Sequence, residues 1–286
     1  MDMLQMPKSR KRSRPSPKRN NRNKPAAMIG QANKSDYFVR NGDGQPVTDR
    51  SSIFPIIAQL SDSEIRFIGT GFFITMNGVF VTAGHVAKEI ADLKCPAAVI
   101  QFTAGGTFVE RPIHKFYVHN GADIAVGVTY QMANDSGEAL TNTVLTLSDR
   151  MPSIGERLHT YAYPNSTIEL RTEDGGKHKA FFNPAFYAGE VEEIYPNGRD
   201  SSMMPGPCFQ TSIHLHGGSS GGPVFDVSGK VVGINSSSLN IATDVSFISC
   251  SQQILDLVLD DVVLPPNPPQ RLSIRELARL NHVVVK

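Results

Sequence analysis

From Ser51 to about Ile248 the sequence is a succession of short apolar runs separated by turn-forming residues, without long helical patterns between them. The runs are rich in Val, Ile and Phe, and Gly, Asn, Asp and Pro separate them, which is typical of β-strands joined by turns. Asn77-Gly78 lies between two such runs, and both residue types favour the positive φ angles of a two-residue hairpin. Many short strands predict antiparallel barrels or a sandwich, so we expect an all-β fold.

Three segments depart from this pattern. Short helices are expected directly after His85, in VAKEIADL, and at Ser251–Val258. Further on, LPPNPPQ is typical of a stiff extended linker. It leads into RLSIRELARL, where Ser273 and Glu276 form a capping-box pattern and Ile274, Leu277, Ala278 and Leu280 form one apolar face. We expect this terminal helix to dock on a partner or a neighbouring copy, or else to fold back onto its own barrel.

Charge is distributed unevenly along the chain. Residues 1–25 carry nine Lys and Arg against one acid, so this part has a net charge of +8. The whole chain has a net charge of +1, and the rest of the chain therefore has a net charge of −7. Residues 1–50 have too few apolar side chains to build a core, and we expect a disordered basic arm. The run from Lys8 to Lys24 is typical of a solvated tail, and it is also compatible with weak binding of nucleic acid or another polyanion, or with a nuclear-import-like signal.

The sequence also bears on compartment and cofactors. No apolar run approaches the roughly 20 residues that a membrane helix requires, and the N-terminus lacks the apolar stretch of a secretory signal. The three cysteines, Cys95, Cys208 and Cys250, have no metal-ligand spacing, and an odd, sparse set suggests reduced thiols. We therefore expect an intracellular, cytoplasmic protein without membrane contact, metal or other cofactor.

Three short motifs carry side chains suited to attack on a peptide carbonyl. Such attack requires a nucleophile, a base with a group that orients it, and N–H donors for the oxyanion. Ser220 lies in GGSSGGP, where small residues allow close backbone approach, so we assign it as the nucleophile, with the N–H groups of Gly218 and Ser220 as donors. His85, at the end of VTAGH, is the candidate base. Asp123, immediately before an apolar run in GADIAV, is the candidate orienting group.

Each motif has a simpler interpretation when it is taken alone. A Gly/Ser run is usually a loop, a single histidine is more often structural, and an aspartate before a strand is more often a turn cap. Together, TAGH, DIAV and GSSGGP resemble the corresponding boxes of the chymotrypsin-like serine peptidases, in the same His–Asp–Ser order. The nearest resemblance is to the bacterial trypsin-like, HtrA-type branch, which also places Gln-Thr where Gln210 and Thr211 stand. It covers roughly Ile53 to Leu257.

The resemblance implies two six-stranded antiparallel β-barrels and a serine endopeptidase that works through an acyl-enzyme. We accordingly divide the chain into the arm (1–50), an N-terminal barrel (51–135), a C-terminal barrel with its terminal helix (136–262), and a Pro-rich linker with a short helix (263–286). It further implies a primary substrate pocket near His214 and at Ser236, Ser237 and Ser238. Because His214 stands where trypsin carries an aspartate, strict Lys/Arg preference is not expected, and a structural role for His214 and His216 is slightly favoured.

Two features depart from the family pattern. Ser219 replaces the aspartate that pairs with a newly cut N-terminus in trypsin-type enzymes, so activation by that route is not expected. Asn165–Pro184 resembles an insertion in a substrate-side loop. Two other functions remain open: a catalytically silent peptide-binding module, and a nucleic-acid-associated protein that has kept a protease fold.

Overall fold

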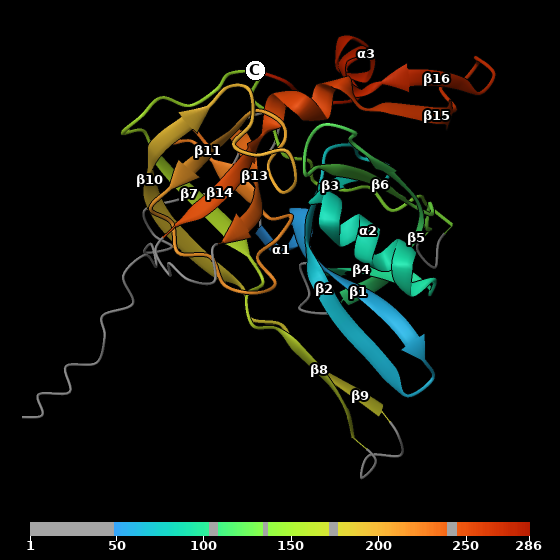
Figure 1. Cartoon of the computed structure of the whole chain (residues 1–286). Helices are drawn as coiled ribbons and strands as arrows, with labels where there is room; N and C mark the ends of the chain where they lie inside the picture. Colours follow the sequence, from blue (N-terminus) through green and yellow to red (C-terminus); the bar gives the residue numbers. More distant parts are fainter. Residues whose placement is uncertain (1–48, 103–107, 134–136, 172–176, 239–244) are drawn as a thin grey trace, which may run out of the picture.

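The computed structural model describes residues 49–102, 108–133, 137–171, 177–238 and 245–286, and its main feature is a pair of closed six-stranded antiparallel barrels (Figure 1). In the first barrel the strands follow the order β1-β2-β3-β6-β5-β4, and in the second β10-β11-β14-β13-β12-β7. The expected all-β fold with two barrels is confirmed. Residues 1–48 of the basic arm (1–50) lie outside the described part of the chain, and its last two residues begin a short helix, α1 (Asp49–Ser52).

The first barrel consists of β1 (Ile53–Ser61), β2 (Glu64–Phe73), β3 (Val79–Thr82), β4 (Ala97–Phe102), β5 (Phe108–Val118) and β6 (Ala125–Thr129). The second consists of β7 (Arg157–Ala162), β10 (Ala185–Tyr195), β11 (Cys208–Thr211), β12 (Pro223–Phe225), β13 (Val231–Ser238) and β14 (Ser246–Cys250). Between β7 and β10 in the sequence, the insertion forms a hairpin of β8 (Thr167–Arg171) and β9 (Lys177–Phe181), in which β8 contacts β2 and the hairpin projects below the barrels in the view of Figure 1.

Strand β2 shows how the sequence fills two cores at once. Successive side chains of a strand point to opposite faces, and Phe72 and Phe73 are both fully buried. Phe73 packs inside the first barrel, with its ring centroid 4.4 Å from that of Phe54. Phe72 lies in a separate cluster that also contains Tyr161 of the second barrel. Both faces of β2 are buried at this end, which is why the sequence is continuously apolar here. One face packs in the core of the first barrel, and the other packs between the two barrels.

Two expected elements differ from the structure. The apolar run Val144–Leu147, one of the short runs that predict strands, forms no strand of a sheet; its last residue, Leu147, makes isolated bridges to Val231 and Val285. The helix expected at Ser251–Val258 is a 3-10 helix, η2 (Ser251–Asp256), and β15 (Val258–Val262) follows it. The change of structure at Val258 has a tertiary cause, because this residue pairs with Ser273 of β16 (Gln270–Ser273). The Pro-rich segment is thus the loop of a hairpin and not a linker that holds a module at a distance.

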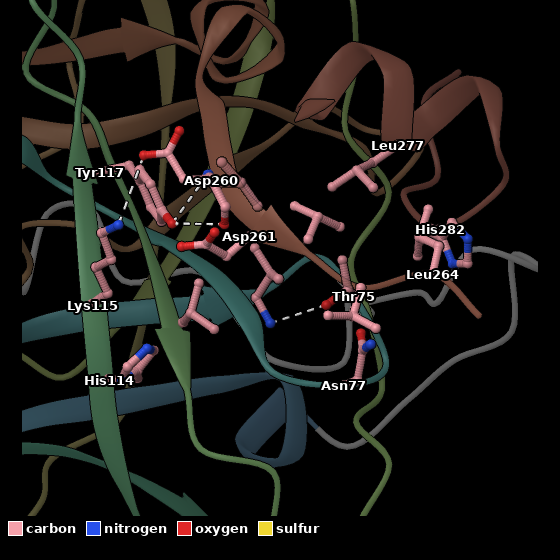
Figure 2. A pocket seen from close by; sticks show the side chains of 15 residues that line it. Thr75, Asn77, His114, Lys115, Tyr117, Asp260, Asp261, Leu264, Leu277 and His282 are labelled. Atoms are coloured by element: carbon pink, nitrogen blue, oxygen red, sulfur yellow. Dashed lines mark hydrogen bonds and ion pairs between the residues drawn. The ribbon is translucent and has the colours of Figure 1, made fainter. Parts of the chain in front are cut away.

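The C-terminal residues fold back onto the barrels. Helix α3 (Ile274–Arg279) begins at the expected capping box of Ser273 and Glu276, and it buries Ile274 and Leu277 in the cluster shared by both barrels. Leu280, expected on the same apolar face, is 51% exposed because the helix has ended at Arg279. A cavity of about 280 Å³ lies between this region and β5, and in Figure 2 Leu277 and Tyr117 flank it. Of the alternatives for this segment, the structure therefore shows the one in which it folds back.

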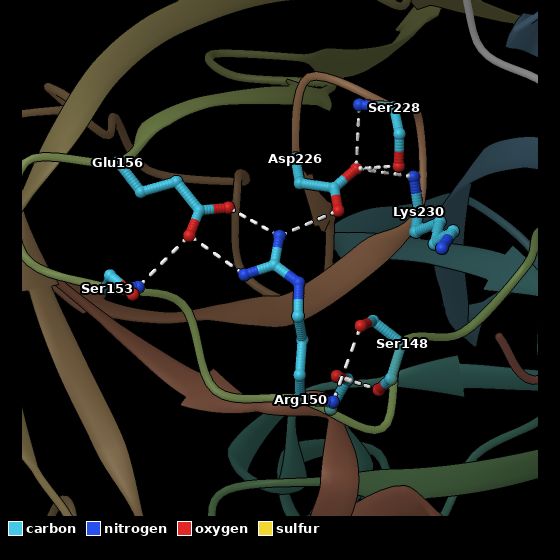
Figure 3. Close-up of polar contacts among 8 residues, drawn as sticks. Ser148, Arg150, Ser153, Glu156, Asp226, Ser228 and Lys230 are labelled. Atoms are coloured by element: carbon cyan, nitrogen blue, oxygen red, sulfur yellow. Dashed lines mark hydrogen bonds and ion pairs between the residues drawn. The ribbon is translucent and has the colours of Figure 1, made fainter.

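A charged cluster fastens the loop before β7 to the β12–β13 turn (Figure 3). Arg150 donates to both carboxylate oxygens of Glu156, and its Nη2 is 2.8 Å from Oδ2 of Asp226. The other Asp226 oxygen accepts hydrogen bonds from the backbone and hydroxyl of Ser228 and from the backbone of Lys230. Burial by itself raises the pKa of Asp226, but these hydrogen bonds outweigh it and hold that pKa below its ordinary value.

This cluster predicts a loss of stability in acid. Because the pKa of Asp226 is lower in the folded than in the unfolded chain, its contribution is present above the unfolded value of about 3.9. That contribution disappears as pH falls through the folded value. We expect Asp226→Asn to lower the free energy of unfolding by about 1.5–3 kcal/mol at pH 6 and to flatten its decline between about pH 5 and 3, in urea titrations followed by circular dichroism. The exposed Asp149→Asn is the control, and equal slopes for the two variants would contradict the assignment.

Candidate active site

His85 and Asp123 come together because the strands beside them are paired. His85 is the second residue of α2 (Gly84–Leu93), which begins directly after β3, and Asp123 lies two residues before β6. The register of the two strands places Thr82 opposite Ala125. The end of one strand and the start of the next therefore meet at the same rim of the first barrel. This pairing brings the histidine and the acid into contact, although 38 positions separate them in the sequence.

Both oxygens of Asp123 bind His85. Oδ2 lies 2.8 Å from Nδ1 of the ring, and Oδ1 accepts a hydrogen bond of 2.8 Å from the backbone N–H of the same histidine. A carboxylate only accepts hydrogen bonds, so the tautomer of a neutral ring that fits this contact has its proton on Nδ1 and its lone pair on Nε2. Burial by itself raises the pKa of Asp123, but the hydrogen bonds and charge of His85 outweigh it and lower that pKa below its ordinary value. The acid is therefore held ionised beside a half-exposed imidazole ring.

A serine of the second barrel completes the surroundings of the acid. The hydroxyl of Ser236, on β13, lies 3.4 Å from the backbone carbonyl oxygen of Asp123 and 2.8 Å from the hydroxyl of Ser249. The sequence assigned Ser236 to the substrate pocket, and the structure places it against the acid as well. The two barrels thus meet directly behind the His85–Asp123 pair.

The loop of Ser220 has a backbone that only glycine can follow at two positions. Gly218 has φ +91° and Gly221 has φ +85°, in the region that residues with a Cβ rarely adopt. A Cβ on Gly221 would also lie 2.1 Å from the carbonyl oxygen of Thr70. The string GGSSGGP is therefore required by the close approach of the first barrel as well as by the turn itself.

The same loop contains the N–H groups of Gly218 and Ser220, whose peptide planes are fixed by the carbonyls that precede them. The carbonyl of Gly217 accepts a hydrogen bond from the backbone N–H of Asn165 at 2.9 Å. The carbonyl of Ser219 accepts from the backbone N–H of Gly222 at 3.0 Å and from Nδ2 of Asn235 at 3.2 Å. In a planar trans peptide the N–H points opposite to the carbonyl, so the N–H groups of Gly218 and Ser220 point away from these partners. Within the described part of the chain, neither N–H donates to a protein acceptor.

Thr70 of β2 holds this loop from the first barrel, and the motif analysis did not identify it. Its N–H donates to the carbonyl oxygen of Ser220 at 2.8 Å, and its hydroxyl donates to that of Gly218 at 2.9 Å. The hydroxyl also accepts a hydrogen bond of 3.2 Å from the N–H of Tyr163. Thr70 is fully buried. Its only sequence signal is its place in the GTGFFI segment, which the resemblance treats as an opening strand.

His85, Asp123 and Ser220 line one cleft of about 590 Å³, together with residues of the loop before β11 such as Met203. A smaller pocket of about 60 Å³ adjoins Ser220, and it is lined by Leu215, His216, Gly217, Ser219, Ser220, Asn235 and Ser236. The cavity in Figure 2 is separate, since none of the three candidate catalytic residues lines it.

Of the residues expected to line the substrate pocket, one lines the small pocket beside Ser220, one does not, and the side chains of two are not described. Ser236 lines the small pocket, whereas His214 does not; its ring packs edge-on against His216 at 4.4 Å between centroids. Burial and the neighbouring His214 lower the pKa of His216, which does line the pocket. Ser237 and Ser238 continue strand β13, and their side chains lie outside the described part of the chain. The sequence missed Asn235, which precedes the three predicted serines.

Other kinds of site find no support among the described residues. No group of three or more His, Cys, Asp or Glu side chains is arranged to hold a metal ion within them. Of the helices that the structure describes, none has the length and apolar character to cross a membrane. All three cysteines are unpaired, and burial raises the pKa of Cys250 to about 12.

Comparison with known proteins places these residues in a family context. Residues 69–234 match the model of the trypsin-like peptidase domain. Similar solved structures include the MamO protease domain from Magnetospirillum magneticum, at 14% identity with a TM-score of 0.50, covering 72% of this chain and 94% of that one. Deg5 is 19% identical with a TM-score of 0.49, covering 70% and 84%.

The HtrA-type protease AlgW, solved with a tripeptide, is 15% identical with a TM-score of 0.48, covering 71% of this chain and 57% of that one. At 14% identity and a TM-score of 0.50, the likeness to the MamO protease domain is one of fold. No curated protein matches the chain.

Proposed function

Because the chain belongs to the family of trypsin-like peptidase domains, we propose that it is a serine endopeptidase with Ser220 as its nucleophile. The observation that carries the proposal is the joint placement of three groups. His85 is held by Asp123 through two hydrogen bonds of 2.8 Å, Ser220 lines the same cleft, and two N–H groups beside Ser220 have no protein acceptor in the described chain. A polypeptide is the substrate that this arrangement fits.

The proposed reaction has two halves. Oγ of Ser220 attacks the peptide carbonyl while Nε2 of His85 takes the hydroxyl proton, and Asp123 stabilises the imidazolium that forms. The N–H groups of Gly218 and Ser220 donate to the oxyanion. The C–N bond then breaks, and the leaving amine takes the proton from His85. Water attacks the acyl-enzyme with the same base, the acid product leaves, and the proton returns to Ser220.

A fluorophosphonate probe tests this proposal, since it labels only a serine that a neighbouring base has activated. We expect labelling of the full chain, a labelled peptide that contains Ser220, and cleavage of members of an unbiased peptide library. His85→Ala is the matched variant, and it should remove both signals. A folded chain that neither reacts with the probe nor cleaves the library would instead favour a silent peptide-binding module.

Thr70 offers a second test, because its hydroxyl bonds the oxyanion loop without contacting the substrate. Thr70→Val keeps the side-chain shape but removes both hydrogen bonds of the hydroxyl. Loss of an oxyanion donor costs about 10²–10³-fold in kcat, and for a displaced loop we expect a loss of about 10–100-fold in kcat with little change in KM. Thr70→Ser should recover most of the activity. A rise in KM alone, or equal losses in the two variants, would show that Thr70 acts only as a packing residue.

A further inference from the structure

A groove of about 440 Å³ lies between helix α2 and strand β5 of the first barrel. The two elements contact each other, and Figure 1 shows them side by side. Three apolar side chains of β5 line the groove, Ile113, Phe116 and Val118, and each is only partly buried. Ile90 and Ala91 line it from α2. A concave surface with partly exposed apolar side chains is typical of a binding site.

The charged side chains that line this groove are all basic. Lys88 and Lys94 belong to the α2 side and Lys115 to β5, and the lining contains no Asp or Glu. Nζ of Lys115 lies 3.7 Å from Oδ2 of Asp260, with both side chains exposed, and such a surface pair contributes little to stability. Within the described part of the chain, Lys88 and Lys94 are exposed and form no ion pair. Since the chain beyond residue 25 has a net charge of −7, the groove is a local reversal of charge.

The groove adjoins the cleft that holds the candidate catalytic residues. Lys88 lines both of them, and it lies three positions after His85 in helix α2. On β5, Val118 lines the groove, and the next residue, His119, lines the cleft. A polypeptide that lies in the cleft can therefore continue into the groove.

We propose that this groove binds an acidic segment of the polypeptide that Ser220 cleaves. Carboxylates of the segment pair with Lys88, Lys94 and Lys115, and apolar residues between them pack on the side chains of β5. A groove lined by one sign of charge attracts the opposite sign and disfavours the same sign. The inference rests on the proposed peptidase function. It adds a determinant of substrate choice that lies away from the residue next to the scissile bond.

Matched fluorogenic peptides test the proposal on the full chain. Their core is a sequence that the peptide library shows to be cleaved, and an extension of alternating glutamate and leucine is joined to either end. One reference extension replaces glutamate by glutamine, and the other replaces leucine by serine. At one of the two ends, we expect the Glu-Leu extension to raise kcat/KM by about 10–30-fold over the Gln-Leu extension.

Two features of this gain identify its source. It should appear mainly as a lower KM, because the contacts are the same in the ground state and the transition state. It should also shrink severalfold between about 50 and 500 mM salt, since exposed charge pairs are screened. The Glu-Ser extension should bind less well than the Glu-Leu extension, because it lacks the apolar contacts.

The Lys94→Glu variant assigns the preference to the groove. Lys94 lines the groove but not the cleft, and glutamate reverses its charge. The Glu/Gln ratio of kcat/KM should fall about fivefold or more in this variant, and a ratio is insensitive to any general loss of activity. Lys230→Gln, in the β12–β13 turn of the second barrel, is the control and should keep the wild-type ratio.

Cys95 gives a readout that does not depend on hydrolysis. It lines the groove and is partly exposed, whereas the other two cysteines are buried. A fluorescent maleimide should therefore label Cys95 first, as peptide mapping can verify. In the Ser220→Ala variant, which binds peptides without cleaving them, the Glu-Leu peptide should slow this labelling. The Gln-Leu peptide and a double-stranded DNA of equal charge should slow it much less.

The outcomes separate the inference from the function on which it rests. Hydrolysis with equal kcat/KM for the Glu-Leu and Gln-Leu peptides, or an unchanged ratio in Lys94→Glu, would overturn the groove assignment and leave the peptidase proposal standing. Stronger protection of Cys95 by DNA than by the acidic peptide would also overturn it, because the groove would then be a phosphate site. Protection by the acidic peptide without probe labelling of Ser220 or hydrolysis would overturn the peptidase proposal, and the groove would remain a binding site for acidic polypeptides.

Discussion

Ser220→Ala is expected to lower kcat for peptide hydrolysis by about a million-fold, the typical cost of removing the nucleophile of a triad. The methyl group fits wherever the hydroxymethyl group fits, so the fold should persist. The loop is held by backbone contacts that the substitution leaves in place, including the bond from Thr70 N–H to the carbonyl of residue 220. Single-turnover hydrolysis measures the loss, and thermal unfolding followed by circular dichroism checks the fold.

Two controls sharpen this experiment. Ser153→Ala changes a serine outside both pockets and should retain wild-type kcat. Ser220→Cys keeps a nucleophile at the same position and should react with thiol-directed probes. Hydrolysis by Ser220→Ala within tenfold of the wild-type rate would assign the nucleophile to another residue.

Asp123→Asn is expected to lower kcat by about 10⁴-fold, as in triads where the acid sets the histidine tautomer. Oδ2 of Asp123 accepts the proton of His85 Nδ1, and Oδ1 accepts the backbone N–H of the same residue. An amide supplies only one acceptor, and its NH₂ group then faces a donor. The ring is driven towards the tautomer with its proton on Nε2, where it cannot act as the base for Ser220.

Measurement of kcat and of the rate of fluorophosphonate labelling should show parallel losses in Asp123→Asn, because both depend on an activated serine. Asp92→Asn, on the exposed face of α2, is the matched control and should match the wild type. A loss below tenfold would mean that another acid orients His85.

The three catalytic candidates could be predicted because each is tied to local sequence. His85 follows one apolar run and Asp123 precedes another, so each motif marks the boundary of a strand. Ser220 lies in a glycine-rich turn that is recognisable by itself. Their meeting could be anticipated only from the family resemblance, since strand register is a tertiary property. The contact of Ser236 with Asp123 is also a tertiary property, because it depends on how the two barrels pack against each other.

The remaining parts of the site could not be predicted because their partners are remote. Thr70 bonds Gly218 across 148 positions, and no local pattern at either end indicates this. His216 lines the small pocket and His214 does not. The two histidines are only two positions apart, so the local sequence does not indicate which of them faces the pocket. In the fold, Val258 is expected from the sequence to be the last residue of a helix, but it is the first residue of β15. This segment becomes a strand because Val258 pairs with Ser273.

The long separation between Thr70 and Gly218 also sets the order in which the site can be assembled during synthesis. The first barrel carries His85 and Asp123, the proposed base and its acid, and all six of its strands leave the ribosome before the loop of Ser220. At about 5–20 residues per second, the loop of Ser220 follows on the order of ten seconds later. Its two N–H groups can be oriented only when the second barrel docks on Thr70. In a nascent chain the His85–Asp123 pair therefore precedes the loop of Ser220, and the three residues come together only when the two barrels have docked.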